Sequence, residues 1–226
     1  MGGSFYEEGE NNLIKAQKEF ENLSKEFEYS DEFKKFKNRP DDFRKFINGL
    51  FQAEGTISVY FRHKTYLNVA YYFSIGQNYS LEAAKVFILL QYFLGGIGEF
   101  KFSNSDKNVI HIKYIVFDKK SIMNVIKPYF SLIYGDKLIA FTKLERIHQI
   151  ITDSGQTSLS NKKDLTYELI NLVYSLNPDG NNPKLTLNEK LELIKDSASN
   201  NFNFNYKQDN FLSVSPFYPK KGTDMV

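Results

Sequence analysis

Apolar residues recur at helical spacing over the range 41–55, and strict alternation begins immediately after it. The apolar residues are Phe43, Phe46, Ile47, Leu50 and Phe51. This pattern predicts a helix that buries much of its surface. Asp41 and Asp42 can cap or complement its start, and we expect Gly55 to end it in the left-handed conformation.

Four alternating segments predict four strands in two antiparallel hairpins, each with one apolar and one solvated face. The segments are 56–62, 68–75, 99–103 and 109–116. Their polar faces carry mostly Ser, Tyr, Arg, Lys, His and Asn, and only one acid, Glu99. An ordinary solvated sheet face also explains these residues, but the donors and positive charge favour a binding face.

A helix over 81–93, capped by Ser80, separates the hairpins, and the GGIG segment at 95–98 predicts a tight turn after it. Further helices are predicted over 118–130 (capped by Asp118 and interrupted at Pro128), 143–151, 161–176 and 187–195. The pattern predicts an α+β protein with three parts. They are a polar helical N-terminal extension (1–40), a core domain (41–196) and an irregular tail (197–226).

One side of the helix at 41–55 carries small residues, with Gly49 and Ala53 four positions apart. Gly inside a helix costs about 1 kcal/mol relative to Ala, so we expect a second helix to approach closely here. If that partner is the same helix of a second copy, two Glu54 carboxylates come near each other. The expected interface consists of Phe46, Gly49, Leu50 and Ala53.

Composition excludes several kinds of site. The absence of Cys excludes thiol catalysis, disulfides and Cys-ligated zinc, and the three His lie in different predicted elements. The chain has neither GxGxxG nor a Walker pattern, so we expect no nucleotide cofactor. With no apolar run of about 18 residues and no leader-like N-terminus, we expect no membrane insertion.

The net charge of +2 conceals an uneven distribution. The first 31 residues hold eight Asp and Glu against three Lys, whereas 56–143 holds eleven Lys and Arg against five Asp and Glu. Such a local basic excess fits a polyanionic partner, although a solvated surface commonly has one too.

The segment 47–55, INGLFQAEG, resembles the signature of the LAGLIDADG homing endonucleases. Gly49, Ala53, Glu54 and Gly55 fall on the third, seventh, eighth and ninth positions, and Leu50 and Phe51 on the fourth and fifth. Two residues depart from the signature: Asn48 is polar where a small residue is frequent, and Gln52 replaces the frequent Asp.

This resemblance implies the αββαββα fold over about 41–176, with an antiparallel four-stranded saddle sheet and added helices. A chain with one motif looks most like the homodimeric, rRNA-gene intron-encoded branch, which cuts both strands of specific DNA sites with Mg²⁺ or Mn²⁺ and leaves short 3′ overhangs. An Asn-, Lys- and Ile-rich composition is typical of AT-rich genomes. The implied location is intracellular, in an organelle (mitochondrion or chloroplast) or the cytoplasm of a mobile-intron host.

The resemblance also implies roles for individual residues. Glu54 is the expected metal ligand and catalytic carboxylate, Gln77 positions water, and Lys143 stabilises the phosphorane, with Lys137 as its alternative. The expected DNA contacts coincide with the solvated sheet face. They are Ser58, Tyr60, Arg62, Ala70, Tyr72, Ser74, Lys101, Ser103, His111 and Lys113.

Two alternatives stay open at this stage. An RNA maturase or a catalytically inactive nucleic-acid-binding protein of the same fold would keep the basic sheet but cleave no DNA. A plain α+β interaction protein would have a sheet face that is merely solvated and would show no salt-dependent DNA binding.

Overall fold

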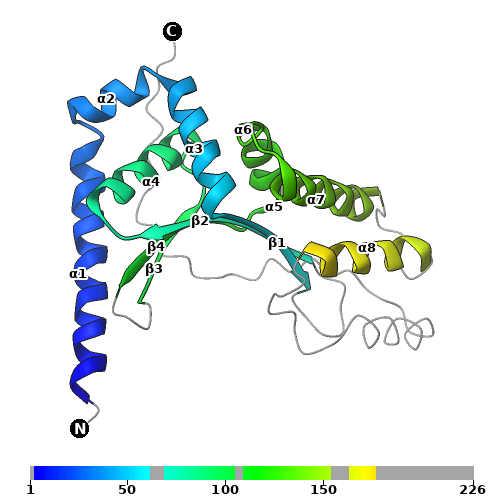
Figure 1. The fold of residues 1–226 in the computed structure, drawn as a ribbon, viewed down its shortest axis with the longest axis horizontal. Helices are drawn as coiled ribbons and strands as arrows, with labels where there is room; N and C mark the ends of the chain where they lie inside the picture. Colours follow the sequence, from blue (N-terminus) through cyan, green and yellow to red (C-terminus); the bar gives the residue numbers. More distant parts are fainter. Residues whose placement is uncertain (1–2, 62–68, 105–108, 154–162, 177–226) are drawn as a thin grey trace.

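The computed structural model describes residues 3–61, 69–104, 109–153 and 163–176, and shows a curved sheet with helices on one side (Figure 1). The elements in chain order are α1 (Gly3–Phe27), α2 (Asp31–Lys37), α3 (Pro40–Glu54), β1 (Gly55–Phe61), β2 (Val69–Asn78), α4 (Leu81–Phe93), β3 (Glu99–Asn104), β4 (Ile110–Val116), α5 (Lys119–Ser121), the π-helical η1 (Ile122–Ile126), α6 (Lys127–Tyr129), α7 (Gly135–Asp153) and α8 (Lys163–Leu176). Within these ranges no helix is long and apolar enough to cross a membrane.

The sheet has the order β1-β2-β4-β3, and each neighbouring pair is antiparallel. Each hairpin pairs as the alternation predicts, and β2 and β4 join the two hairpins at the centre, with Phe73 opposite Val116. The α+β class and the predicted order of helix, hairpin, helix, hairpin are therefore confirmed. The expected tail at 197–226 and helix at 187–195 lie outside the described residues.

The core lies between the helices and the apolar sheet face. Phe51 of α3 is fully buried, and its ring centroid lies 4.9 Å from that of Phe73 and 4.8 Å from that of Phe130. Burying one such ring contributes roughly 1.5–3 kcal/mol. This packing fixes the end of α3 over the middle of the sheet.

Local signals in the sequence set several boundaries correctly. Ser80 caps α4 by accepting a hydrogen bond from the Ala83 backbone N–H (3.1 Å), and Asp118 accepts one from that of Ser121 (2.7 Å). The glycines of the GGIG turn have φ values of 72°, 79° and 84°, which other residues rarely adopt. The turn reverses the chain between α4 and β3.

Glycine is needed at position 55 for a different reason from the one that the sequence suggested. Its backbone is extended (φ −76°, ψ 152°) rather than left-handed. A Cβ at Gly55 would lie 1.9 Å from the Phe51 ring, so glycine is required by close approach. The start of α3 agrees in part: Asp41 and Asp42 lie in the first turn, where acids complement the helix dipole, but no side chain caps the helix, and Asp42 pairs with Arg39 at 2.7 Å.

The C-terminal helices also differ from the expected ranges. Helix α7 begins at Gly135 rather than at 143, and Gly135 itself has a left-handed φ of 55°, which other residues rarely adopt. The predicted helix 118–130 contains a π-helical segment before Pro128, which has no backbone N–H to donate. Helix α8 is held to α7 by Arg146, which donates to both carboxylate oxygens of Glu168 (2.6 and 2.7 Å) and so lowers the pKa of Glu168.

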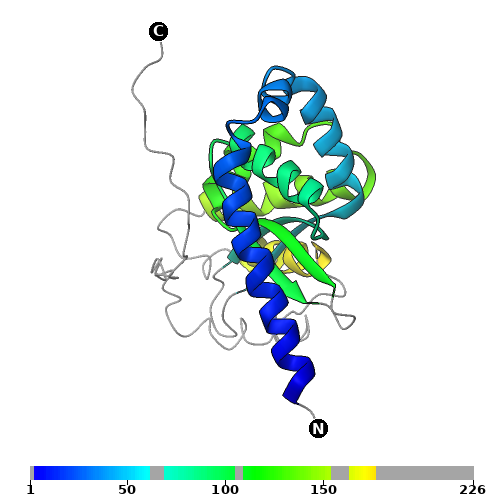
Figure 2. The same cartoon turned by 90° about the vertical axis from the view of Figure 1, so that its left-hand side faces the viewer.

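The long helix α1 lies against the β3–β4 hairpin and α4, and its N-terminal part extends past the strands (Figure 2). Phe20 packs on Phe100 and Phe102, with ring centroids 4.6 and 5.5 Å away. The Tyr79 hydroxyl donates to Glu19 Oε2 at 3.0 Å, and burial together with that carboxylate raises the pKa of Tyr79. The first helix of the predicted N-terminal extension, α1, therefore packs on the sheet.

Candidate nucleic-acid interface and active site

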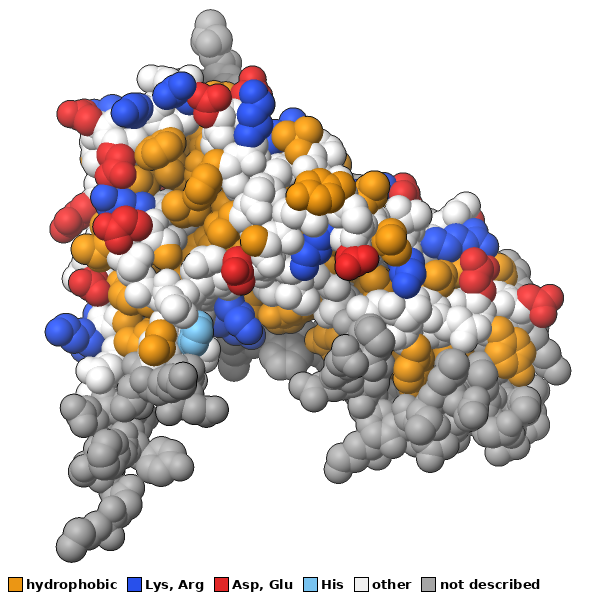
Figure 3. Space-filling view, viewed as in Figure 1, with side chains coloured by type: hydrophobic (Ala, Val, Ile, Leu, Met, Phe, Trp, Pro, Cys, Tyr) orange, Lys and Arg blue, Asp and Glu red, His pale blue; other side chains and the backbone are white. Residues whose placement is uncertain are grey.

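The polar face of the sheet lies on the side away from most helices, and Figure 3 shows the molecule hollowed beneath it, with histidine and lysine side chains at the margin. The strand register places Ser58 opposite Tyr72, and Ser103 opposite His111. Since residues opposite each other in a sheet share a face, the four strands present one surface. We refer to this surface as the polar sheet face.

Two exposed lysines, Lys101 and Lys113, lie directly opposite each other on this face. Like charges directly opposite each other destabilise a sheet. Lys101 is partly compensated by Glu99, whose carboxylate lies 3.3 Å from its ammonium. The polar sheet face therefore carries positive charge at a cost to folding.

Two residues of the expected contact set are buried in this structure. Ala70 and Ser74 are only 3% and 4% exposed, because these small side chains lie on β2 between larger neighbours, with Tyr60 opposite Ala70. Alternation alone cannot show this, since it predicts the face of a residue but not its depth. Arg62 lies outside the described residues.

A cavity of about 460 Å³ joins the end of α3 to the polar sheet face. Its lining residues are Glu54, Thr56, Ser74, Gly76, Gln77, Asn78, His111 and Lys113. Glu54 and Gln77, which are 23 positions apart, are thus brought together as expected. Thr56, Gly76 and Asn78 were not among the expected site residues. Thr56 lies on the predicted polar face. Gly76 and Asn78 lie beyond residue 75, where the second strand was expected to end, because β2 continues to Asn78.

Glu54 is the last residue of α3, and its side chain is exposed. Among the described residues it has no ion-pair partner, and no three His, Cys, Asp or Glu side chains gather into a metal-binding group. A cation here would have one carboxylate from this chain. That donor set fits Mg²⁺, which is commonly held by one or two carboxylates and substrate phosphates.

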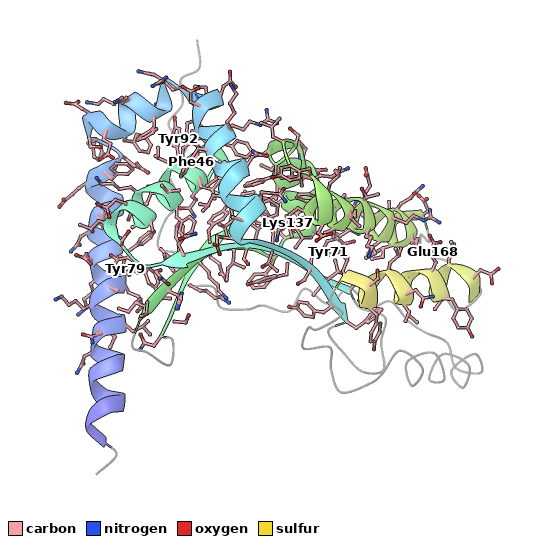
Figure 4. All side chains as sticks on the ribbon, in the orientation of Figure 1. Phe46, Tyr71, Tyr79, Tyr92, Lys137 and Glu168 are labelled. Carbon is pink, nitrogen blue, oxygen red and sulfur yellow. The ribbon has the colours of Figure 1, made fainter. Side chains whose placement is uncertain are left out.

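Lys137 is the basic residue that the structure brings to the end of α3. Its ammonium donates to the carbonyl oxygen of Gly55, next to Glu54, and lies 5.8 Å from the centroid of the Phe51 ring (Figure 4). Lys143 lies two turns further along α7 and donates to the Ser175 carbonyl oxygen of α8 at 3.2 Å. Of the two expected candidates, Lys137 is therefore the one that lies at the end of α3, since α7 starts earlier than predicted.

The expected interface side of α3 is open in this chain. A Cβ added at Gly49 would meet nothing within 4 Å among the described residues, and Ala53 is exposed. Phe46, labelled in Figure 4, is 54% exposed, an unusual state for a large apolar side chain. Leu50 is half-buried. These residues form a small-residue surface next to Glu54 that a second helix could contact closely.

Residues 47–148 match the family described as LAGLIDADG endonuclease. Among solved structures, the homing endonuclease I-TnaI aligns with a TM-score of 0.51 and 19% identity over 67% of this chain and 97% of its own. The archaeal intron-encoded homing endonuclease I-Vdi141I, solved with DNA, aligns with a TM-score of 0.52 and 21% identity over 70% of this chain and 97% of its own.

The group I intron-encoded homing endonuclease I-CeuI, also solved with DNA, gives a TM-score of 0.53 and 10% identity over 81% of this chain and 90% of its own. At these identities the likeness concerns the fold. No curated protein matches the chain.

Proposed function

Residues 47–148 belong to the LAGLIDADG endonuclease family, and from that premise we propose that this protein is a site-specific double-strand DNA endonuclease. The observation that supports this most is the cavity that joins Glu54 to the polar sheet face. A carboxylate for the chemistry and a basic surface for the polyanion thus meet at one place.

The polar sheet face suits duplex DNA. A β-ribbon fits the major groove, where polar side chains can read base edges, while lysines contact phosphates and set the register. The exposed pair Lys101 and Lys113 supplies the charge, and Ser58, Tyr60, Tyr72, Ser103 and His111 supply donors and acceptors.

Residues that line the cavity, and Lys137 next to it, divide the work of phosphodiester hydrolysis. Glu54 would hold Mg²⁺ or Mn²⁺, which when bound activates water and neutralises charge on the phosphate. The Lys137 ammonium contacts the carbonyl oxygen of Gly55, the residue that follows Glu54, and we assign to it the stabilisation of negative charge that develops on the phosphate. Gln77 in the same cavity can orient a water molecule by hydrogen bonds.

Double-strand cleavage needs two such centres, and one chain holds one Glu54. We propose that two copies meet through the open side of α3, at Phe46, Gly49 and Ala53, and that each copy cuts one strand. The expected short 3′ overhangs, and an organellar or cytoplasmic location in a mobile-intron host, are part of this proposal.

The test is cleavage of a randomised duplex library with Mg²⁺ and, in parallel, with EDTA. Sequence-specific double-strand breaks that require the metal support the proposal. Tight, salt-dependent binding of a nucleic acid without a break would instead indicate the maturase or inactive binder of the same fold. If the protein showed no salt-dependent binding to nucleic acid, the sheet would have only a role in protein interaction.

Replacing both Lys101 and Lys113 by Ala is expected to weaken DNA binding at low salt and flatten its salt dependence. Each lysine–phosphate contact contributes about 0.9 to the slope of log affinity against log salt, so we expect a decrease of roughly 2. Titrations of a labelled duplex at several salt concentrations measure the slope.

The matched control replaces two exposed lysines of α2, Lys34 and Lys35, which lie away from the sheet (Figure 1). This variant loses the same charge but should keep the slope within about 0.5 of the native value. If the two double variants had equal slopes of log affinity against log salt, the polar sheet face would not be the DNA-binding surface.

A further inference from the structure

One face of α3 carries Arg44, Asn48 and Gln52, spaced four residues apart, and all three bind the segment 128–134 that leads into α7. We call these three side chains the polar ladder. The two residues that depart from the family signature, Asn48 and Gln52, are both members of it. Their contacts therefore indicate what this chain gains from the departures.

The first two members hold the end of α6 and the residues that follow it. Arg44 donates to the carbonyl oxygens of Tyr129 (2.9 Å) and Pro128 (2.7 Å) and to Ser131 Oγ (2.8 Å). Asn48 is 2% exposed; its amide donates to the Tyr129 carbonyl (3.2 Å), and its oxygen accepts from the Leu132 N–H (3.0 Å). A buried amide satisfied on both sides fixes the backbone that it contacts.

Gln52 closes the ladder one turn later. Its amide nitrogen donates to the Tyr134 carbonyl (3.3 Å), and its amide oxygen accepts from the Tyr134 N–H (3.1 Å). Tyr134 immediately precedes Gly135, where α7 begins, and Lys137 lies in the first turn of that helix. Gln52 is thus the last side chain of α3 to fix the backbone before Lys137.

We propose that Gln52 is a positioning residue, which fixes the start of α7 so that the Lys137 ammonium stays at the Gly55 carbonyl beside Glu54. The Tyr134 side chain itself is 69% exposed, so Gln52 acts on the backbone and not on the packing of that ring. This inference rests on the proposed function in that it assigns Gln52 a part in the same reaction.

The arrangement suits positioning because Lys137 has a long, flexible side chain. Lys carries a large rotamer entropy, and its ammonium is a point charge without a preferred plane of contact. A displacement of about 1 Å at a reacting group can reduce the rate roughly 100-fold. Fixing the backbone three residues earlier limits the volume that the ammonium explores.

The first experiment needs no activity. Amine acetylation of the free protein, followed by mass spectrometry, measures the labelling rate of each lysine. In Gln52→Met, which keeps the length but removes the amide and both its bonds to Tyr134, Lys137 should label about fivefold faster, the factor expected if the one hydrogen bond of its ammonium, to the Gly55 carbonyl, is lost. Lys143 on the same helix serves as internal control and should not change.

The matched control is Gln91→Met. Gln91 also ties a loop backbone, by donating to the Gly98 carbonyl at 3.1 Å, but it lies on α4. Its loss should leave Lys137 labelling unchanged. An unchanged Lys137 in Gln52→Met, or an equal increase at Lys143, would overturn the proposal. Gln52→Asn, whose amide is one methylene shorter, replaces Gln52→Met if that variant does not fold.

The second experiment uses single-turnover cleavage. Gln52→Met should slow cleavage about 10- to 100-fold with DNA affinity unchanged within twofold. Combined with Lys137→Met it should be no slower than Lys137→Met alone, because a residue that acts only through another adds nothing once that residue is lost. Additive losses would contradict the proposal.

The two experiments separate the two proposals. If Lys137 labels faster in Gln52→Met while the native chain cuts no DNA, the positioning role stands and the endonuclease function falls. If the native chain cuts DNA but the labelling of Lys137 does not respond to Gln52, the endonuclease function stands and the positioning role falls.

Discussion

A Glu54→Gln variant is expected to bind duplex DNA like the native chain and to cleave it at least about 1000-fold more slowly. The amide keeps the shape of the side chain but loses the charge that would hold the cation, which contributes several kcal/mol to stabilisation of the transition state. Since Glu54 is exposed and forms no ion pair within the described residues, folding should not change.

Single-turnover cleavage, titration of a labelled duplex and thermal unfolding together measure this effect. Glu26→Gln, an exposed acid on α1, serves as the matched control and should cleave at the native rate. If Glu54→Gln cleaved within tenfold of the native chain, Glu54 would not be the catalytic carboxylate. If it lost DNA binding as well, the effect would lie in recognition rather than in chemistry.

Replacing Gly49 by Leu is expected to separate the proposed dimer, with a rise of at least about 100-fold in its dissociation constant. The open space at Gly49 leaves the fold of one copy intact, and the monomer should gain up to about 1 kcal/mol from better helix propensity. The added side chain would instead prevent close approach of a second α3, as happens at other small-residue helix contacts.

Sedimentation equilibrium across a range of concentrations measures the dissociation constant, and thermal unfolding of dilute protein reports on the monomer. Gly49→Ala, with a single methyl group, should give a smaller loss of the same sign. The fraction of DNA with double-strand breaks should fall as the fraction of dimer falls. A Gly49→Leu variant that stays dimeric would place the twofold on another surface.

Sequence spacing predicted the candidate site in outline and failed at specific points. Ser74, His111 and Lys113, which line the cavity together with Glu54, were expected on the polar face from alternation, because the pleat fixes which side each residue faces. Lys143 was preferred to Lys137 because the helix was expected to begin at 143, whereas α7 begins at Gly135. That start depends on Gly135 and on contacts with α3, which no local pattern contains.

The glycines show the same division. In the GGIG turn the sequence predicted a tight turn, and the positive φ values of Gly95, Gly96 and Gly98 agree, since backbone freedom is a local property. For Gly55 the position was right and the reason was wrong. Only the packed structure shows that the Phe51 ring occupies the space where a Cβ would be.

By itself, the sequence determined the kinds of element, their order and the apolar and polar faces of the strands, because these depend on the local periodicity of side chains. Only the tertiary structure decided which residues meet: β2 beside β4, Glu54 with Gln77 at one cavity, and Lys137 at the end of α3. Those juxtapositions depend on packing and hydrogen bonds between residues far apart in the chain.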